Sequence, residues 1–277
     1  MNELNWPSFE IGSYRAACPA CGRNEREKTL GVTIEHGGKG VAHCFRCGHI
    51  ETNRPDAKAL SARPQPIQRR QVPLKREVLS EYGLDLWSAY EPLSGAAVAY
   101  LKARRCVVPP ADGHLSWHAD LRHPCGKSGP ALVALISHVK SHKPLSLHRT
   151  WVQPNGQKAA FDPPRLLLAN HAMKDGVIRL WPDECVTYGL AVVEGIETAL
   201  SLAWAYRPVW SCIDAGHLAA FPVLPGIETL VIGADNDPAG QKAANECATG
   251  WASADAEVMV TQEAANDLND VLQGLAA

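Results

Sequence analysis

The last third of the chain alternates short, uninterrupted apolar runs with helical stretches, and this alternation restricts the fold more than any other feature. The apolar runs and the helical stretches between them cover residues 190–193, 198–206, 209–213, 229–234, 239–251 and 257–260. Strands that are apolar on both faces and alternate with helices are typical of a parallel sheet covered on both sides. Ligands of such sheets bind beyond the carboxyl ends of the strands. We therefore expect an α/β domain over 188–277 with a site at that edge.

Acidic side chains follow two of these apolar runs, and a further acidic stretch follows the last run. Glu194 follows the first run, and Asp235 and Asp237 follow the third. Residues two apart on an extended chain point to the same side. Clustered carboxylates repel one another unless a cation lies between them, and their oxygens suit Mg²⁺ or Mn²⁺. The expected ligands are Glu194, Asp235, Asp237 and, from the stretch at 267–270, Asp267.

Glu197 has two interpretations. Three residues after Glu194, it either completes the metal site or lies in the first turn of a helix. The helix dipole favours an acid in that turn, and we favour the helix interpretation.

Two cysteine pairs within the first 50 residues predict a zinc ribbon. They read Cys18-Pro-Ala-Cys21 and Cys44-Phe-Arg-Cys47, separated by 22 residues. A gap of two residues lets both thiolates of a pair point at one ion, and zinc prefers four such ligands in a closed site. A segment of ~50 residues has too little apolar mass to fold alone, so the metal would supply its folding energy.

Other interpretations of these cysteines stay open. They could form a redox pair or carry no ligand. His43 and His49 flank the second pair and could replace a cysteine as ligand, whereas His36 fits a loop.

Composition and the remaining cysteines indicate a globular protein of a reducing compartment. The 277 residues, 46% apolar and 20% charged, allow two domains, or one with an appendage, and exclude global disorder. No window approaches the ~18–20 apolar residues of a membrane span, and no secretion signal is visible. Nine cysteines are an odd number, which disfavours a disulfide framework. We expect a soluble, cytoplasmic protein in which five cysteines are ordinary small side chains: Cys106, Cys125, Cys185, Cys212 and Cys247.

The net charge of −2 conceals a strong segregation along the chain. The net charges of residues 1–76, 77–99, 100–180 and 181–277 are +6, −4, +8 and −12. Basic N-terminal and central regions with an acidic C-terminal region predict one surface for a polyanion and another for cations. The alternative is that solvated charges are scattered along the chain by chance.

Four segments follow from these patterns. Residues 1–51 form the ribbon, and 52–76, rich in Pro, Arg and Lys, form an extended linker because so few apolar residues cannot offset the entropy of folding. Residues 77–187 form a small, mixed α+β, basic region, with helices from about 76 and over 96–105 and strands near 131–136, 145–151 and 165–168. Residues 188–277 form the parallel-sheet domain.

Three stretches resemble the successive signatures of the Toprim domain. They are Glu194-Gly-Ile-Glu-Thr-Ala-Leu200, Ala234-Asp-Asn-Asp-Pro-Ala-Gly240 and Asp267-Leu-Asn-Asp-Val-Leu272. This metal-dependent α/β module is shared by bacterial-type DNA primases, topoisomerases and some nucleases. The sequences of these motifs are similar to those of phage- and plasmid-type primases. The basic half of the catalytic core of those primases resembles three further stretches of this chain, 100–104, 129–133 and 147–150. With the zinc ribbon in front, the resemblance covers nearly the whole chain.

The resemblance implies roles for the acids and also has departures. Glu194 would act as acid/base or metal ligand, Asp235 and Asp237 would hold Mg²⁺, and Asp267 would be a further ligand. Bacterial replicative primases usually have Asp where this chain has Thr198, and their zinc site often contains a His.

The function that these features predict is that of a DNA primase, a nucleotidyltransferase with DNA-directed RNA polymerase activity in phage or plasmid replication. Its partners would be a single-stranded DNA template and nucleoside triphosphates. No helicase ATPase motor is visible, because Gly126-Lys-Ser128 lacks the first glycine of a phosphate loop. We therefore expect a separate helicase and no membrane. A Toprim-type nuclease and a zinc/Toprim module that binds DNA without chemistry are the alternatives.

Basic and aromatic side chains are the candidates for contact with nucleotide and DNA. Arg149, Lys158 and Arg165 would grip phosphates by charge-assisted bonds. Phe45 and Arg46 on the ribbon, with Trp6, His43 and Arg15, offer stacking faces and donors to single-stranded nucleic acid, unless the ribbon merely braces a protein contact.

Overall fold

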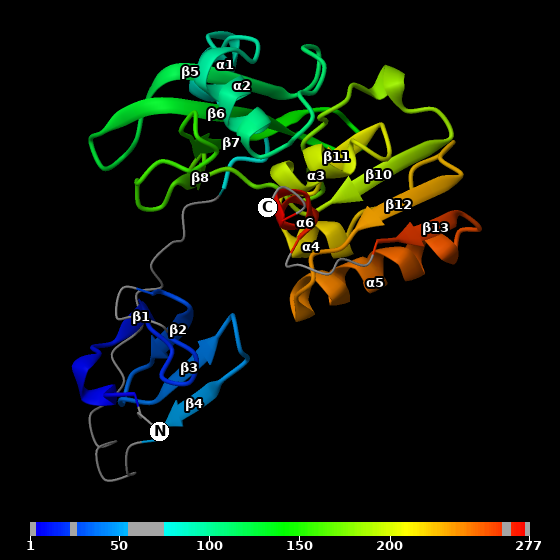
Figure 1. Ribbon diagram of the computed structural model, residues 1–277. Coiled ribbons are helices and arrows are strands. Elements are labelled where there is room, and N and C mark those ends of the chain that lie inside the picture. Colours follow the sequence, from blue (N-terminus) through cyan, green and yellow to red (C-terminus); the bar gives the residue numbers. More distant parts are fainter. Residues whose placement is uncertain (1–3, 23–26, 55–74, 262–266, 275–277) are drawn as a thin grey trace. The chain divides into compact units, whose positions relative to one another are not determined.

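The computed structural model describes residues 4–22, 27–54, 75–261 and 267–274 (Figure 1). The chain divides into two compact units, residues 1–72 and 73–277, and each is described by itself. The linker expected over 52–76 lies outside the described residues except at its two ends. At the first end the expectation is wrong, because Thr52 and Asn53 pair with Val41 and Gly40 and so belong to a strand.

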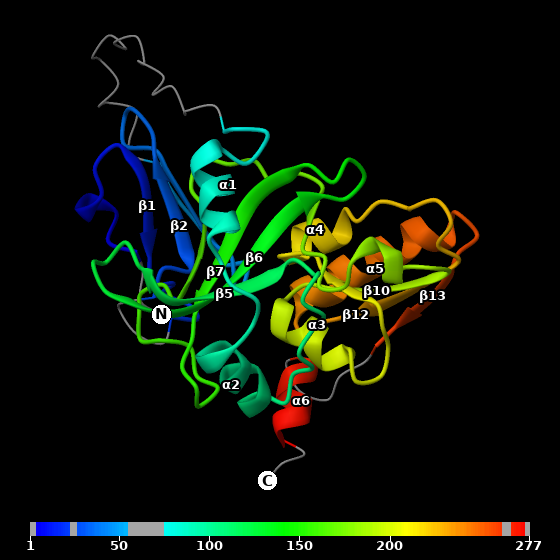
Figure 2. The same cartoon turned by 90° about the horizontal axis from the view of Figure 1, so that it is seen from above.

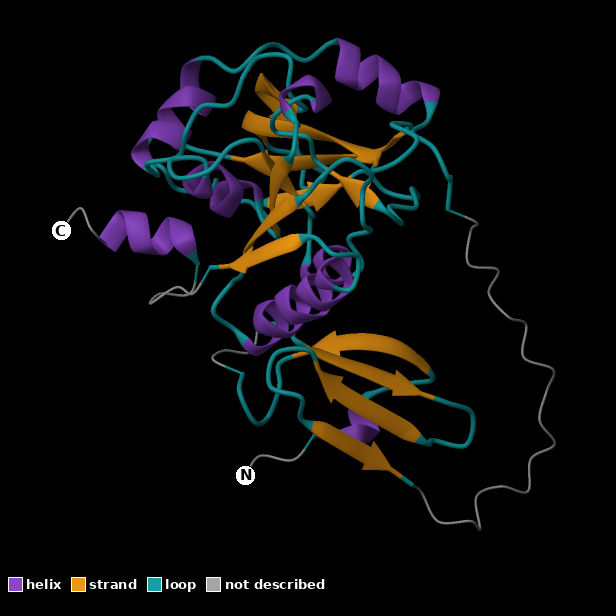
Figure 3. Cartoon of the chain, turned by 90° about the vertical axis from the view of Figure 1, so that its right-hand side faces the viewer, coloured by secondary structure: helices purple, strands orange, loops and turns teal. Residues whose placement is uncertain are grey.

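The first unit is a four-stranded antiparallel ribbon (Figure 3). Its strands lie in chain order, β1-β2-β3-β4. A short 3₁₀ helix, η1, precedes the strands. Side chains that alternate along β2 and β3, such as Val32 and Ala42, face one small core. The elements are η1 (Trp6–Ser8), β1 (Gly12–Ala16), β2 (Leu30–Ile34), β3 (Gly40–Cys44) and β4 (Ile50–Asn53).

The first half of the second unit packs two helices on an antiparallel sheet of order β5-β6-β7-β8, with β9 paired to β6. Helix α1 begins at Glu81, later than the sequence suggested, because Ser80 caps it by accepting the Gly83 N–H at 3.3 Å. The elements are α1 (Glu81–Ser88), α2 (Gly95–Ala103), β5 (Leu115–Arg122), β6 (Ser128–His138), β7 (Pro144–Trp151), β8 (Arg165–Leu167), β9 (Gly176–Val177) and the 3₁₀ helix η3 (Asp183–Cys185).

The second half of this unit contains a four-stranded, fully parallel sheet of order β11-β10-β12-β13. Side chains of β10 alternate between its two faces. Ala191 and Val193 pack with α3, whereas Leu190 and Val192 pack with α4 and α5. The elements are β10 (Gly189–Val193), α3 (Ile196–Leu202), β11 (Val209–Ser211), α4 (Ala215–Ala219), β12 (Thr229–Gly233), α5 (Pro238–Ala252), β13 (Glu257–Val260) and α6 (Leu268–Gly274).

Helix α6 lies beside α3 (Figure 2), and its Asn269 reaches Arg104, the residue that follows α2. Its Asn269 is completely buried, and the side-chain amide donates to the Arg104 carbonyl at 2.8 Å and to the Ser201 hydroxyl at 2.9 Å. These bonds hold the acidic stretch before and within α6 against the rest of the unit. The sequence did not predict α6 as a helix.

The α/β fold class, with a parallel sheet between helices and a cysteine cluster near the N-terminus, is confirmed. Several boundaries differ from the prediction; for example, α3 ends at Leu202 and β11 at Ser211, both short of the predicted ends. Among the described residues, no helix is long and apolar enough to cross a bilayer.

Candidate functional site

Three parallel strands end side by side at one edge of the sheet. Val193, the last residue of β10, pairs with Gly233 of β12 and Ser211 of β11. Glu194 is the next residue after β10, and Asp235 is the second residue after β12. The carboxyl edge therefore carries both acids, at the position where ligands of parallel sheets bind.

Burial and neighbouring acids raise the pKa values of Glu194 and Asp235. Burial, and then the charges of Asp235 and Asp237, raise the pKa of Glu194 to about 7. Burial, and then the charge of Asp267, raise the pKa of Asp235 to about 6. Each acid makes ionisation of its neighbours harder, so the cluster as a whole favours a cation.

The donor set fits a hard divalent cation. Within the described part of the chain, Asp235 Oδ1 is buried and has no hydrogen-bond partner. Asp237 Oδ1 accepts the Gly240 N–H at 2.7 Å as the N-cap of α5, which leaves its second oxygen for a ligand. A Cβ at Gly240 would lie 2.6 Å from the Asp235 carbonyl oxygen, so only glycine lets α5 begin this close to the acids. Glu194, Asp235, Asp237 and Asp267 are the acids that the sequence predicts as ligands, but among the described residues only the four ribbon cysteines bring three or more ligand atoms close enough to share one ion.

Glu197 lies in the first turn of α3, and it is not a solvated acid of that turn. Its side chain is 9% exposed and contacts three donors from elsewhere in the unit. The Tyr100 hydroxyl donates to Oε1 at 2.8 Å, Arg165 Nη2 lies 3.2 Å from Oε2, and Lys158 Nζ lies 3.7 Å from Oε1. Burial opposes ionisation of this carboxyl, but the charges of Arg165 and Lys158 offset it and lower its pKa to about 2.

The three expected phosphate ligands differ in their surroundings. Lys158 and Arg165 both pair with Glu197, and their side chains remain 34% and 41% exposed. Arg149 is half-buried, donates from Nη2 to the Leu167 carbonyl at 3.1 Å and lies over the Trp151 ring. The structure thus brings Lys158 and Arg165 together. Arg149 lies on β7, and because its neighbour Thr150 pairs with Arg165, the side chains of Arg149 and Arg165 point to opposite faces of the sheet.

The four cysteines of the ribbon converge. All four sulfur atoms lie within 4.8 Å of one another, with Cys18–Cys47 at 3.7 Å and Cys21–Cys44 at 3.6 Å. Tetrahedral ligands at ~2.3 Å from zinc would be about 3.8 Å apart, so the cluster fits one zinc ion. It is the one group of this kind among the described residues, and it contains no histidine.

The predicted nucleic-acid residues of the ribbon fall into two groups. Phe45 is 64% exposed, with the Arg15 guanidinium 4.4 Å over its ring and His43 against its edge. Arg46 instead forms an ion pair with Glu27 at 2.9 Å. Trp6 donates its indole N–H to Glu51 and contributes to the ribbon core.

Comparison with known families decides the nature of the parallel-sheet region. Residues 189–276 match the Toprim domain family. These residues form a Toprim domain. Residues 78–180 match a domain family of unknown function, and no curated protein matches the chain.

Several solved structures are similar to this chain. The primase fragment of the bacteriophage T7 primase-helicase protein is 17% identical over 95% of this chain and 96% of its own, with a TM-score of 0.42. A DNA primase domain from Pseudomonas aeruginosa is 14% identical over 71% and 74% of the two chains, with a TM-score of 0.44. The zinc-binding and RNA polymerase domains of the Aquifex aeolicus primase are 13% identical over 98% and 80%, with a TM-score of 0.37.

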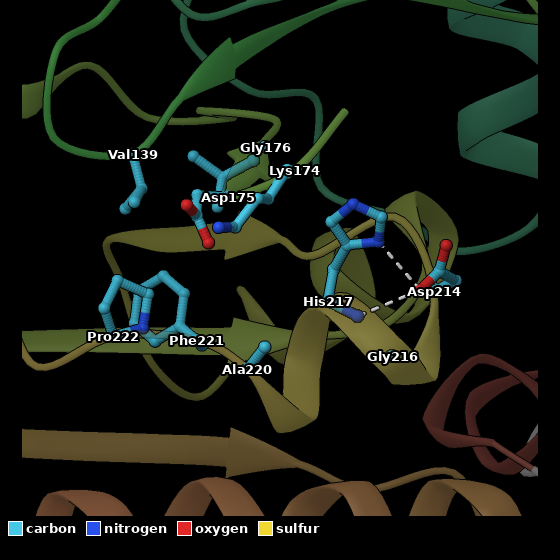
Figure 4. A pocket seen from close by; sticks show the side chains of 11 residues that line it. Val139, Lys174, Asp175, Gly176, Asp214, Gly216, His217, Ala220, Phe221 and Pro222 are labelled. Atoms are coloured by element: carbon cyan, nitrogen blue, oxygen red, sulfur yellow. Dashed lines mark hydrogen bonds and ion pairs between the residues drawn. The ribbon is translucent and has the colours of Figure 1, made fainter. Parts of the chain in front are cut away.

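Asp214 is a further acid at the carboxyl edge of the parallel sheet, and the sequence did not lead us to predict it. It follows β11, its charge contributes to the raised pKa of Glu194, and it caps α4 by accepting the His217 N–H at 2.9 Å. An Asp three residues before a His, directly after an apolar run, was the available signal. Figure 4 shows the two side chains facing each other beside a cavity of about 290 Å³, which Lys174 and Phe221 also line.

His217 should make the stability of this unit depend on pH. Its Nδ1 faces Asp214 Oδ1 at 2.8 Å and its Nε2 faces the Met173 carbonyl at 2.7 Å, so both ring nitrogens have acceptors. The bond to Asp214 raises the pKa of His217. The stabilisation is therefore complete below the unfolded pKa of about 6.5 and is lost as the pH rises through the folded pKa.

We expect His217→Gln to lower Tm by roughly 2–4 °C at pH 6, since solvent screening limits the effect to about 1 kcal/mol. The difference from wild type should shrink as the pH is raised. Thermal unfolding followed by circular dichroism across this range measures it. Parallel curves for the two proteins at every pH would contradict the expectation.

Proposed function

We propose that this protein is a DNA primase that joins nucleoside triphosphates into short primers on a single-stranded DNA template. The observation that supports the proposal is the carboxyl edge of the parallel sheet, where Glu194 and Asp235 follow two paired strands and Asp237 caps the next helix. The basic half of the same unit contributes Lys158 and Arg165, which pair with Glu197 on α3 of the Toprim domain. An acidic centre for cations and a basic pair for phosphates are the two parts that nucleotidyl transfer needs.

The residues would divide the reaction between them. In primer extension the 3′ oxygen attacks the α-phosphorus and pyrophosphate leaves. Mg²⁺ bound by Asp235, Asp237 and Asp267 would neutralise charge on the phosphates. Lys158 and Arg165 would hold phosphate oxygens of the incoming nucleotide by charge-assisted bonds. Glu194, the first residue after β10 at the same edge, would accept the proton of the attacking 3′ hydroxyl at a carboxylate oxygen.

The zinc ribbon would bind the template. Duplex DNA offers no free template, so we further propose that a helicase opens the strand for this protein. We propose that the protein acts in phage or plasmid replication.

One assay tests the proposal against its alternatives. Single-stranded DNA, labelled ribonucleotides and, in parallel, labelled deoxyribonucleotides are supplied with Mg²⁺ and the full-length, zinc-loaded chain. Short labelled oligomers that depend on Mg²⁺ and on template are the expected result. Shortened template without new oligomers would support a nuclease instead, and a gel shift alone would support a binding module.

Phe45→Ala should weaken binding of single-stranded DNA. The exposed ring already carries the Arg15 guanidinium on one face, which is how stacking platforms for bases are built. Because base–aromatic stacking contributes about 1–3 kcal/mol per base, Kd should rise by about 5- to 150-fold. Fluorescence anisotropy with a labelled oligothymidine measures this change.

Ile50→Ala is the matched control, because Ile50 is an equally exposed apolar side chain of the ribbon, at 65%, without an aromatic face. Equal losses in the two variants would show that general apolar contact, and not stacking on Phe45, carries the binding.

A further inference from the structure

Glu197, in the first turn of α3, has three side-chain partners. Its three partners come from three separate stretches: Tyr100 from α2, Arg165 from the first position of β8, and Lys158 from the connection between β7 and β8. The carboxylate itself is nearly inaccessible. A single buried acid on α3 of the Toprim domain thus fixes two cations of the basic half.

The cluster has more positive than negative charge. Two cations share one carboxylate, which leaves a surplus of one positive charge. Arg165 reaches both oxygens of Glu197 with Nη2 alone, so the other donors of its guanidinium are not used by this pair. Both cations keep about a third or more of their side chains exposed, and their outer faces are therefore available to an anion.

A metal-ligand role for Glu197 does not fit these contacts. An ion at this carboxylate would compete with three donors that already hold it, and the Tyr100 hydroxyl is itself completely buried. Buried donors without an acceptor are costly. The pairing therefore separates Glu197 from the acids of the carboxyl edge.

We propose that Glu197 is a positioning residue that holds Lys158 and Arg165 side by side as one polyphosphate-binding pair. That the natural ligand is the triphosphate of an incoming nucleotide rests on the proposed function. The pairing and its consequence for Lys158 rest on the contacts alone.

Lys158 gives this inference a distinctive readout. Burial lowers the pKa of its ammonium group, the Glu197 charge counteracts that effect, and the charges of Arg165 and Arg104 add to it. Removing the Glu197 charge leaves the three lowering effects unopposed. Lys158 then loses its proton, and with it its attraction for phosphate, at a lower pH than in the wild type.

The experiment measures binding of inorganic tripolyphosphate by calorimetry from about pH 7 to pH 10, with the full-length, zinc-loaded chain. In Glu197→Gln the side chain keeps its shape and still accepts from Tyr100. We expect the affinity for tripolyphosphate near pH 7 to stay within about threefold of wild type, because both cations remain. The alkaline limit of binding, which is the pH above which the affinity falls, should decrease by about one pH unit. In Lys158→Met the alkaline limit of the wild type should disappear, and adding Glu197→Gln should cause no further shift.

Glu246→Gln is the matched control, because Lys242 and Glu246 form an exposed ion pair of the same length, 3.7 Å. It should leave the alkaline limit unchanged. Lys158→Met alters a partly exposed side chain, so it keeps the test decisive if Glu197→Gln fails to fold. Absence of tripolyphosphate binding by the wild type, or an unchanged limit in Glu197→Gln, would overturn the inference.

Primer synthesis is measured separately on the same variants. A wild-type protein that shows the expected tripolyphosphate behaviour without making primers would refute the proposed function and leave the inference standing. Primer synthesis together with an unchanged alkaline limit in Glu197→Gln would refute the inference alone.

Discussion

Asp235→Asn should abolish Mg²⁺-dependent primer synthesis while the protein stays folded or becomes more stable. The substitution removes an anionic ligand whose Oδ1 has no other partner among the described residues. Loss of partners that only orient metal ligands already costs 10- to 100-fold, so loss of a ligand should reduce the rate by at least ~100-fold. Initial rates of labelled-primer formation at saturating Mg²⁺ measure the effect.

The stability of this variant separates a lost ligand from a damaged fold. Burial and the neighbouring acids raise the pKa of Asp235 to about 6. The ionised form is thus disfavoured in the folded state, and the cost is fully present above about pH 6 and absent below the unfolded pKa of about 3.9. A neutral side chain removes that cost, so Tm without Mg²⁺ should equal or exceed that of wild type at pH 7.5.

Asp255→Asn provides the control for both measurements. Asp255 is an exposed acid that precedes β13, at the amino end of that strand. It should change neither rate nor Tm. Primer synthesis by Asp235→Asn at the wild-type rate would remove the acids of the carboxyl edge from the mechanism.

The parallel sheet was predictable because its signals are local. A strand buried on both faces is apolar throughout, and the residue that ends it is adjacent in sequence. Glu194 and Asp235 could therefore be assigned to one edge before the strand order was known. The N-cap role of Asp237 was also readable, since Asp directly before Pro238 is a typical helix start.

The surroundings of Glu197 were not predictable, because they depend on contacts distant in sequence. Its bond from Tyr100 joins residues 97 positions apart, and its bond from Arg165 joins residues 32 apart. The local pattern indicates only the first turn of a helix, which is correct and says nothing of burial. Lys158 and Arg165 were predicted as phosphate ligands one by one, and their common partner emerges only from the fold.

The order of the strands in the parallel sheet was also not predictable from the sequence. Chain order places β11 after β10, yet β12 lies on the other side of β10, so the acids after β11 and β12 flank Glu194 from opposite sides. Asp214 follows the predicted strand 209–213 directly, so its place at this edge was readable from the local pattern, whereas its side relative to Glu194 was not. A pattern of strands and helices predicts a parallel sheet, whereas the crossovers that set its order depend on packing across the whole unit.

Zinc removal should unfold the ribbon and leave the second unit folded. The ribbon core contains few buried side chains, and two of them, Cys18 and Cys44, belong to the metal cluster. A core of this size rarely supplies more than about 3–5 kcal/mol, whereas a structural zinc contributes about 10–16 kcal/mol in small zinc-binding peptides. Hydrogen exchange by mass spectrometry, with and without a zinc chelator, should show loss of protection in β1–β4 and unchanged protection in β5–β13.

Substitution of single cysteines tests the same claim without a chelator. Cys44→Ser removes a ligand at the end of β3 and should reproduce the loss of protection in the ribbon, because three thiolates no longer close the site. Cys125→Ser, at an exposed cysteine of the second unit, should behave as wild type.

Because the exposed Phe45 lies directly after Cys44 and packs on Gly31 of β2, loss of the metal should also weaken binding of single-stranded DNA at least as much as Phe45→Ala does. Retention of full amide protection in β1–β4 by the zinc-free protein would mean that the apolar core alone folds the ribbon.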